Sequence, residues 1–170
     1  RYHSTTALEG DDSYKMDVVN LAYEFGSPDS FIDSGVVRAF YEVAEIEQYT
    51  LDERAAARTP VSIDRYFSYD QEIGGIELNL WKNISGQYLS HRLGFGLEYR
   101  DRKTEEYRDG LSTNLSSGDQ TNVLLGEVFP LRDFPISRTK ESAIFIEDTI
   151  SIGDWKVIAA LRGDQFDLSP

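Results

Sequence analysis

LSHRLGFGLEYR, residues 89–100, alternates between apolar and polar side chains along its whole length. Leu93 and Leu97 fall on one side of an extended chain, whereas Arg92 and Glu98 fall on the other. This period of two residues is that of a β-strand, whose successive side chains point to opposite faces. A strand of a soluble sandwich runs to only about five or six residues. About 9 to 11 tilted residues cross a bilayer, so the length of this stretch favours a membrane strand.

Composition excludes several classes of function. The chain has 170 residues and a formal net charge of −13, whereas a nucleic-acid partner calls for clustered Lys and Arg, so we expect no nucleic-acid binding. No stretch of about 18 apolar residues is present, which excludes a membrane helix but not a barrel of short, half-apolar strands. The sequence has no cysteine, so disulfide and thiolate chemistry are both ruled out.

Strand patterns recur along the chain and predict six strands. Besides residues 89–100 they are Tyr14–Phe25, the segment from Val36, the segment from Tyr66 to Leu80, and the two halves of an expected hairpin, residues 140–152 and 155–166. In the third strand the apolar residues change from odd to even positions at Gly74-Gly75. An inserted residue there would flip the faces, so the pattern predicts a β-bulge.

The connections between these strands alternate in length. Those after the first, third and fifth strands are short, whereas those after the second and fourth run to roughly 15 and nearly 40 residues. Short turns at one end of an up-and-down meander and long loops at the other are typical of an outer-membrane barrel. We therefore predict an all-β fold, an antiparallel up-and-down meander of about six strands in a transmembrane β-barrel. Residues 1–13, 46–62 and 101–138 are the expected extracellular loops, and a short helical turn could lie in 47–60.

The barrel hypothesis assigns the two faces. Apolar side chains would point outward to lipid and polar ones inward to the lumen. An aromatic girdle is expected from the strand-end residues Trp81, Tyr88, Tyr99 and Trp155. In the strand 140–152 the isoleucines share a face with Asp148, and we favour that face as the outward one. A soluble antiparallel sheet with the same residues packed in a core is the alternative.

Three stretches carry a family resemblance: FPLRDFPISRTKESAIFIEDTISIGDWKVIAALRGDQFDLSP (129–170), RYFSYDQEIGG (65–75) and HRLGFGLEY (91–99). They resemble the barrel of TonB-dependent outer-membrane receptors, in the haem and haemoglobin branch that is related to transferrin and lactoferrin receptors. The branch has a similar FP-x-RDFP phrase and a strand similar to FIEDTI. Gly163, where the family prefers an aromatic residue, and Glu147, in place of Gln, depart from its pattern.

This resemblance implies a 22-stranded barrel around a plug domain. Six strands cannot close such a barrel, and an open sheet edge is not viable in lipid. The sequence shows no plug and no energy-coupling box, and the branch's ligand motif is expected beyond Pro170. The chain is therefore expected to be an internal segment of a transporter for iron acquisition in the outer membrane of a Gram-negative bacterium. Haem or haemoglobin is the expected cargo, with another ferric chelate such as a siderophore as the wider class.

The expected partners follow from the same resemblance. They are outer-membrane lipid, the TonB energy-coupling complex acting through the missing plug, and haem, haemoglobin or another iron carrier. Ligand capture would fall to the extracellular loops. Two rival functions remain open: another outer-membrane β-protein, such as a porin or an adhesin, and a soluble extracellular β-sandwich binding domain.

The sequence offers no residue for catalysis, for cofactor binding or for a resident metal, and we expect no enzyme. There is no G-x-S-x-G motif, no Gly-rich phosphate loop and no triad pattern around the two histidines. His91 is expected at the membrane interface and His3 in an outer loop. The acidic run containing Glu9, Asp11 and Asp12 lacks the spacing of a calcium loop. Arg162-Gly163-Asp164 spells an integrin-binding tripeptide, but inside a strand it predicts a charged pair on one lumen-facing side.

Overall fold

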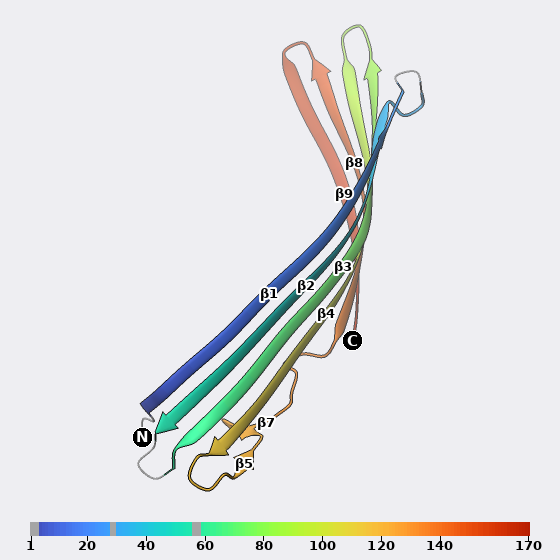
Figure 1. Cartoon of the computed structure of the whole chain (residues 1–170). Helices are drawn as coiled ribbons and strands as arrows, with labels where there is room; N and C mark the ends of the chain where they lie inside the picture. Colours follow the sequence, from blue (N-terminus) through green and yellow to red (C-terminus); the bar gives the residue numbers. More distant parts are fainter. Residues whose placement is uncertain (1–3, 28–29, 56–58) are drawn as a thin grey trace.

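The computed structural model describes residues 4–27, 30–55 and 59–170, and their main strands form one long, twisted antiparallel sheet (Figure 1). The main strands are β1 (Ser4–Phe25), β2 (Ser34–Ala55), β3 (Val61–Ser85), β4 (Ser90–Asn114), β8 (Ser137–Ile152) and β9 (Trp155–Ser169). They lie side by side in the order β1-β2-β3-β4-β8-β9. Three two-residue strands, β5 (Gln120–Thr121), β6 (Val123–Leu124) and β7 (Glu127–Val128), occupy the segment between β4 and β8. The predicted all-β antiparallel meander is confirmed.

The first four strands are about twice as long as the sequence pattern predicted. They run to 22 or 25 residues each and include most of the first two segments expected to be loops and residues 101–114 of the third. Residues 4–13 belong to β1, 46–55 to β2 and 101–114 to β4, and no helical turn interrupts 47–55. The loop conformation was therefore wrong there; the extracellular placement stays a prediction. An antiparallel ladder pairs its backbone groups whatever the side chains are, so a strand continues even where both faces are polar.

Gly74 and Gly75 do not form a bulge. Tyr41 pairs with Gly74 and Phe40 with Gly75 in an uninterrupted register between β2 and β3. The glycines instead make room for rings, because a Cβ on Gly75 would overlap the side chain of Phe40. The apparent change of phase arises because the apolar residues on either side of Gly74 belong to opposite faces of the same regular strand.

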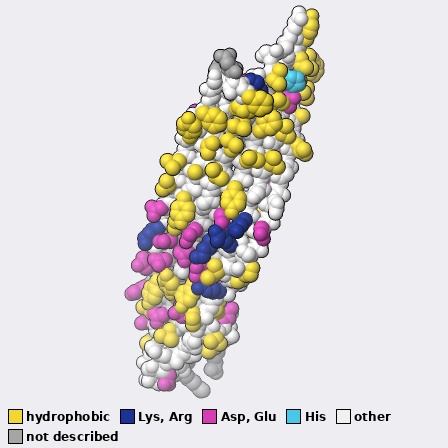
Figure 2. Space-filling view, turned by 90° about the vertical axis from the view of Figure 1, so that its right-hand side faces the viewer, with side chains coloured by type: hydrophobic (Ala, Val, Ile, Leu, Met, Phe, Trp, Pro, Cys, Tyr) yellow, Lys and Arg dark blue, Asp and Glu magenta, His cyan; other side chains and the backbone are white. Residues whose placement is uncertain are grey.

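The unbroken register sorts the side chains into two faces. One face carries an apolar band over all six main strands, in which Leu78 pairs with Val37 and Leu97, and Leu97 pairs with Ile144. We call this the band face, and Figure 2 shows the band as the yellow area in its upper part. Its side chains are open to the surroundings; Ile144, for example, is 62% exposed. We call the opposite side the charged face.

The isoleucines of β8 lie on the band face together with Asp148, as the alternation indicated. The girdle is only partly as expected. Tyr99 lies on the band face, and Tyr88 and Trp155 are 81% and 78% exposed beside the short turns. Trp81, however, lies on the charged face, where a Cβ on Gly94 would contact its ring, because its position in β3 has the other parity.

The segment between β4 and β8 folds back over the charged face. Leu124 and Phe129 are buried there, and both lie where a Cβ on Gly110 would project. Val36 is the other buried apolar side chain among the described residues, so the sheet has no central hydrophobic core. No helix in the described part of the chain is long and apolar enough to span a membrane.

A pair of glycine substitutions tests how rings and glycines interlock. A Cβ on Gly96 would overlap the ring of Phe145, whereas a Cβ on Gly163 meets only Ile144 Cγ2 at 3.9 Å. We expect G96A to destabilise the intact protein by about 1–3 kcal/mol through overpacking. The matched G163A variant should be tolerated, and F145L should restore part of the loss in G96A. The midpoint of urea unfolding measures all three, and equal midpoints for G96A and G163A would contradict the interlock.

Candidate functional site on the charged face

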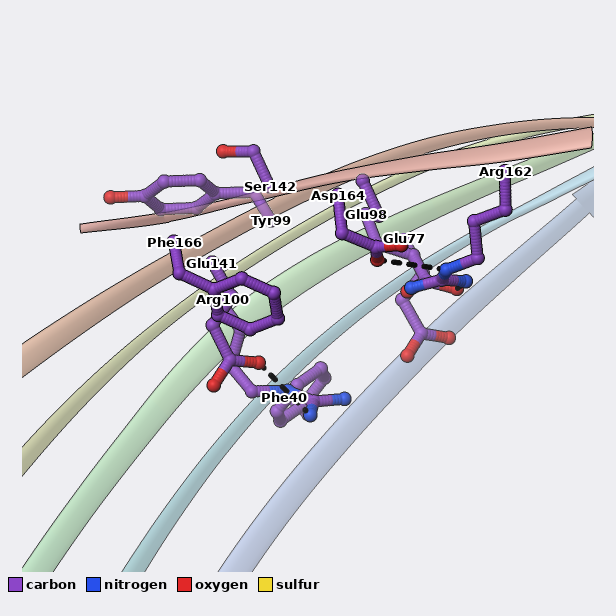
Figure 3. A pocket seen from close by; sticks show the side chains of 11 residues that line it. Phe40, Glu77, Glu98, Tyr99, Arg100, Glu141, Ser142, Arg162, Asp164 and Phe166 are labelled. Carbon is purple, nitrogen blue, oxygen red and sulfur yellow. Dashed lines mark hydrogen bonds and ion pairs between the residues drawn. The ribbon is translucent and has the colours of Figure 1, made fainter.

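A compact ionic cluster lies on the charged face at the level of the apolar band (Figure 3). Register brings it together from five strands: Glu77 of β3 pairs with Glu98 of β4, and Ala143 of β8 separates Glu98 from Asp164 of β9. We define the inner charged cluster as Arg38, Glu77, Glu98, Arg100, Glu141, Arg162 and Asp164. In Figure 3, Tyr99 and Ser142 rise from the opposite side of the sheet, as their parity requires.

Arg162 is the centre of this cluster. Its two terminal nitrogens donate to the Glu98 carboxylate at 3.2 and 2.7 Å, and its Nε donates to Asp164 Oδ1 at 2.8 Å. Its guanidinium also stacks over Phe145, 5.9 Å from the ring centroid. The shared face of Arg162 and Asp164 is confirmed, and the two side chains bind each other. The tripeptide therefore lies within a β-strand, and its two charged side chains form ion pairs.

The rest of the cluster is more loosely paired. Arg100 lies 3.6 Å from Glu141 and over the ring of Phe40, while Arg38 is 3.9 Å from Glu77. The hollow among these residues measures only about 80 Å³. Pockets for small ligands typically span about 300–1,000 Å³, so this hollow is too small for an iron chelate. The inner charged cluster is best described as a polar wall.

A larger opening lies further along the charged face, beneath the folded-back segment. Two adjoining hollows of about 290 and 280 Å³ are both lined by Arg65 and Phe129. We call them together the loop-side hollow. Phe67 and Arg108 also line it, so guanidinium groups and aromatic rings border the same space. Its size approaches that of a small-ligand pocket.

The folded-back segment is held over this hollow by several polar contacts. Arg108 donates to both carboxylate oxygens of Asp133, at 2.7 and 3.0 Å, and its backbone pairs with that of Leu131. Glu106, 2% exposed, accepts the Asp133 N–H at 2.7 Å. The guanidinium of Arg108 also lies 5.6 Å from the centroid of the Phe129 ring. These contacts fix one wall of the loop-side hollow against β4.

Arg65 is the cation in this hollow with the most freedom to bind an anion. Its side chain is 46% exposed, and its nearest carboxylate, Asp52, lies 3.8 Å away. Asp52 is 3% exposed and is held more closely by Arg54, whose Nε donates to Asp52 Oδ2 at 2.7 Å. This hydrogen bond from Arg54 keeps the pKa of the Asp52 carboxyl below its usual range. Asp52 therefore stays ionised, and its main partner is Arg54 and not Arg65.

On the band face, acidic residues follow the apolar band. Asp70 pairs with Glu45 on one side and Glu105 on the other, which places three carboxylates in a row. Burial, followed by the negative charges of Glu45 and Glu105, raises the pKa of Asp70. The row is thus a source of electrostatic repulsion in the folded protein.

The histidines and acids considered from the sequence lie as follows. His91 Nδ1 is 2.7 Å from Asp148 Oδ2, so the acid in the apolar band has a polar partner that the sequence did not reveal. His3 lies outside the described residues. Glu9 and Asp11 face the opposite side of β1 from Asp12, because they differ in parity. Within the described residues, no group of three or more His, Asp or Glu side chains could hold a metal ion.

Sequence reasoning did not identify the loop-side hollow. Arg65 and Arg108 are 43 positions apart and come together only because β3 pairs with β4, with Arg65 opposite Gly110. Phe129 also lines the hollow, and its position depends on the path of the irregular segment between β4 and β8. The only available signal was the resemblance of the stretch FPLRDFP, which marked the segment without placing it.

Removing Arg162 tests the inner charged cluster. R162Q leaves Glu98 and Asp164 without their guanidinium and beside Glu77, so we expect the intact protein to unfold at lower urea concentration. Adding E98Q removes one of the orphaned charges, so the E98Q/R162Q variant should be more stable than R162Q. The unfolding midpoints of wild type, R162Q, E98Q and E98Q/R162Q together form a double-mutant cycle. Additive effects would show that the two side chains do not interact.

The acidic row on the band face makes a prediction about pH. At pH 7 the charge of Asp70 disfavours the folded protein, so D70N should raise the free energy of unfolding, measured in EDTA. As pH falls through the raised native pKa towards the ordinary value, wild-type Asp70 takes up a proton and the advantage of D70N should disappear. S68N, on the same face of β3, is the control without a change of charge. A D70N gain that persists at low pH would contradict the assignment.

Comparisons with known proteins agree with this architecture. A scan of protein-family models matches residues 1–170 to the family described as TonB dependent receptor-like, beta-barrel. A search of curated proteins finds no match. Among solved structures, the chain is similar to the unliganded ferric citrate transporter FecA, with 19% identity, a TM-score of 0.57, and coverage of 92% of this chain and 21% of that one.

It is also similar to BauA, the ferric preacinetobactin receptor from Acinetobacter baumannii, with 16% identity, a TM-score of 0.59, and coverage of 94% of this chain and 25% of that one. At these identities the likeness concerns the fold alone. The chain spans roughly a fifth to a quarter of the length of these receptors. Since the family model matches the whole length of a sheet with the expected meander, the chain belongs to the TonB-dependent receptor family and forms part of its β-barrel.

Proposed function

We propose that this chain is part of the wall of an outer-membrane transporter that takes up iron as an anionic ferric chelate. The observation that carries the proposal is the two-faced sheet of a TonB-dependent receptor, with an open apolar band on one side and ionic clusters on the other. In this arrangement the band face meets lipid and the charged face meets the lumen. The long strands then extend beyond the bilayer on the side of the folded-back segment.

The loop-side hollow supports the choice of ligand class. Arg65 and Arg108 supply positive charge, and Phe67 and Phe129 supply apolar surface beside it. Guanidinium groups bind carboxylates and similar anions in a planar, often bidentate geometry. An anionic chelate with apolar or aromatic parts therefore fits this chemistry. By their names, the similar solved structures are a ferric citrate transporter, FecA, and a ferric preacinetobactin receptor, BauA.

Haem is the second candidate ligand. It is favoured by the resemblance of residues 129–170 to the haem and haemoglobin branch, and its propionates and flat macrocycle would suit the same mixture of arginines and rings. In either case the proposed path is the same. The outer segments capture the ligand, energy coupling through a plug elsewhere in the receptor releases it, and it passes along the charged face.

Substitution of Arg65 tests the proposal. In the intact receptor, R65Q should weaken binding of the transported ferric chelate by about tenfold, the worth of one charge-assisted hydrogen bond. Asp52 keeps Arg54, so the fold should be preserved. R38Q, on the charged face at the level of the apolar band, is the matched control and should bind normally.

Binding of ferric citrate, a ferric siderophore and haem is measured separately by tryptophan fluorescence quenching. If R65Q binds only one of the three ligands more weakly than wild type does, that ligand is the cargo. Equal binding of all three by R65Q, R38Q and wild type would contradict the role of the loop-side hollow.

A further inference from the structure

Two tyrosine rings from neighbouring strands pack together on the band face, beyond the apolar band. Tyr66 of β3 and Tyr107 of β4 have ring centroids 6.4 Å apart and ring planes inclined by 59°. This distance lies within the range of about 4.5–7 Å for interacting aromatic pairs. The register brings the rings together, because Tyr66 pairs with Asp109, two residues beyond Tyr107. Within the residues that the structure describes, no other two tyrosine rings are in contact.

Charged side chains hold both rings in place. The Tyr66 hydroxyl donates a hydrogen bond to Glu47 Oε1 at 2.9 Å. The guanidinium of Arg132 lies over Tyr107, 5.6 Å from the ring centroid, and is itself held by Glu105 at 2.9 Å. Both tyrosines are only partly exposed. The two phenols are therefore kept in contact at the surface, where a small soluble oxidant reaches them.

Glu47 is placed to accept a proton from Tyr66. Their hydrogen bond raises the pKa of the Tyr66 phenol, so this phenol is protonated at neutral pH. When a phenol loses one electron its hydroxyl becomes strongly acidic, and the proton has to leave together with the electron. Glu47 Oε1 already lies within the reach of about 2.6–3.2 Å that a proton acceptor needs. Oxidation of Tyr66 therefore requires no rearrangement of its surroundings.

We propose that Tyr66 and Tyr107 form an oxidative cross-linking site, at which a peroxide-driven one-electron oxidant joins the two rings as dityrosine. Each phenol loses one electron and one proton, and the proton of Tyr66 goes to Glu47. The two phenoxyl radicals form a carbon–carbon bond between ring positions next to their oxygens. The hydrogens on these two carbons then move to the oxygens and restore the hydroxyls. The two electrons and two protons released reduce one molecule of hydrogen peroxide to two of water.

The cross-link joins the two strands that carry the loop-side hollow. Arg65 and Arg108 are the chain neighbours of Tyr66 and Tyr107 and lie on the opposite face of the sheet. A covalent bond between the rings therefore ties together the strand segments that position both arginines. It also restricts the unfolded chain, so the cross-linked protein should resist urea better than the unmodified one. The inference depends on the packing of two rings and a proton acceptor, and not on the proposed ligand.

The test exposes the intact protein, at low concentration, to hydrogen peroxide and a haem peroxidase. Trypsin then releases Tyr66 within residues 66–82 and Tyr107 within residues 104–108. Mass spectrometry detects these two peptides joined with the loss of two hydrogen atoms, and fragment ions distinguish Tyr66 from Tyr69. The fluorescence of dityrosine reports the rate.

Four variants separate the two rings from the proton acceptor. Y66F and Y107F each remove one of the hydroxyls, whereas E47Q removes the proton acceptor and keeps both rings. Y49F is the matched control. Tyr49 lies opposite Tyr66 and its hydroxyl donates to Asp64 at 2.6 Å, but within the described residues its ring contacts no other tyrosine ring.

We expect wild type and Y49F to give the joined peptides within single chains, Y66F and Y107F to give none, and E47Q to give them severalfold more slowly. A cross-link that persists in Y66F or Y107F would overturn the proposal, and so would equal rates in E47Q and wild type. Tyr88 is 81% exposed and reacts first if exposure alone decides. A wild-type product joined through Tyr88 of separate molecules, without the bond between Tyr66 and Tyr107, would therefore also overturn it.

Discussion

The continuous backbone register between neighbouring strands is the constraint on which the rest of the structure depends. From β2 to β9 each main strand pairs with the next without a shift, and β1 has its irregularity only near its start, between Thr5 and Ala7. Side chains alternate with a period of two, so a slip of one residue would move every apolar side chain of a strand to the other face. The apolar band and the charged face exist only while this register holds.

Glycines and rings reinforce the register. Phe40 covers Gly75 and Phe145 covers Gly96, each from the neighbouring strand. A ring that lies over a glycine disfavours pairings that place a larger residue opposite it, because that residue would bring a Cβ into the ring. The interlock thus contributes specificity in a sheet that has no hydrophobic core to impose it. It also holds Phe145 where Arg162 can stack on it.

Charge is organised differently on the two faces. On the charged face the central ionic contact joins different strands, Arg162 of β9 and Glu98 of β4. On the band face they occur in sequence along the strands, with cations next to the apolar band and acids such as Asp70 beyond them. The first arrangement suits a wall beside a hydrophilic passage. The second suits a surface that passes from an apolar medium into water.

The sequence by itself determined the strands, their antiparallel order and the faces of individual residues. The alternation in residues 89–100 placed Leu97 and Glu98 on opposite faces, and it correctly paired Arg162 with Asp164 on one side. These inferences succeeded because they depend on parity within a single strand. The family was likewise accessible, because short phrases of the chain carry it.

Only the tertiary structure decided the ends of the strands, the course of β3 through Gly74 and the face of Trp81. Polar stretches such as residues 101–114 lack a hydrophobic signal, yet the ladder extends through them because neighbouring backbones supply their hydrogen bonds. The loop-side hollow and the contact of His91 with Asp148 needed the register between strands as well. Periodicity reports which way a side chain points, but the residue that it meets is set by the pairing of the strands.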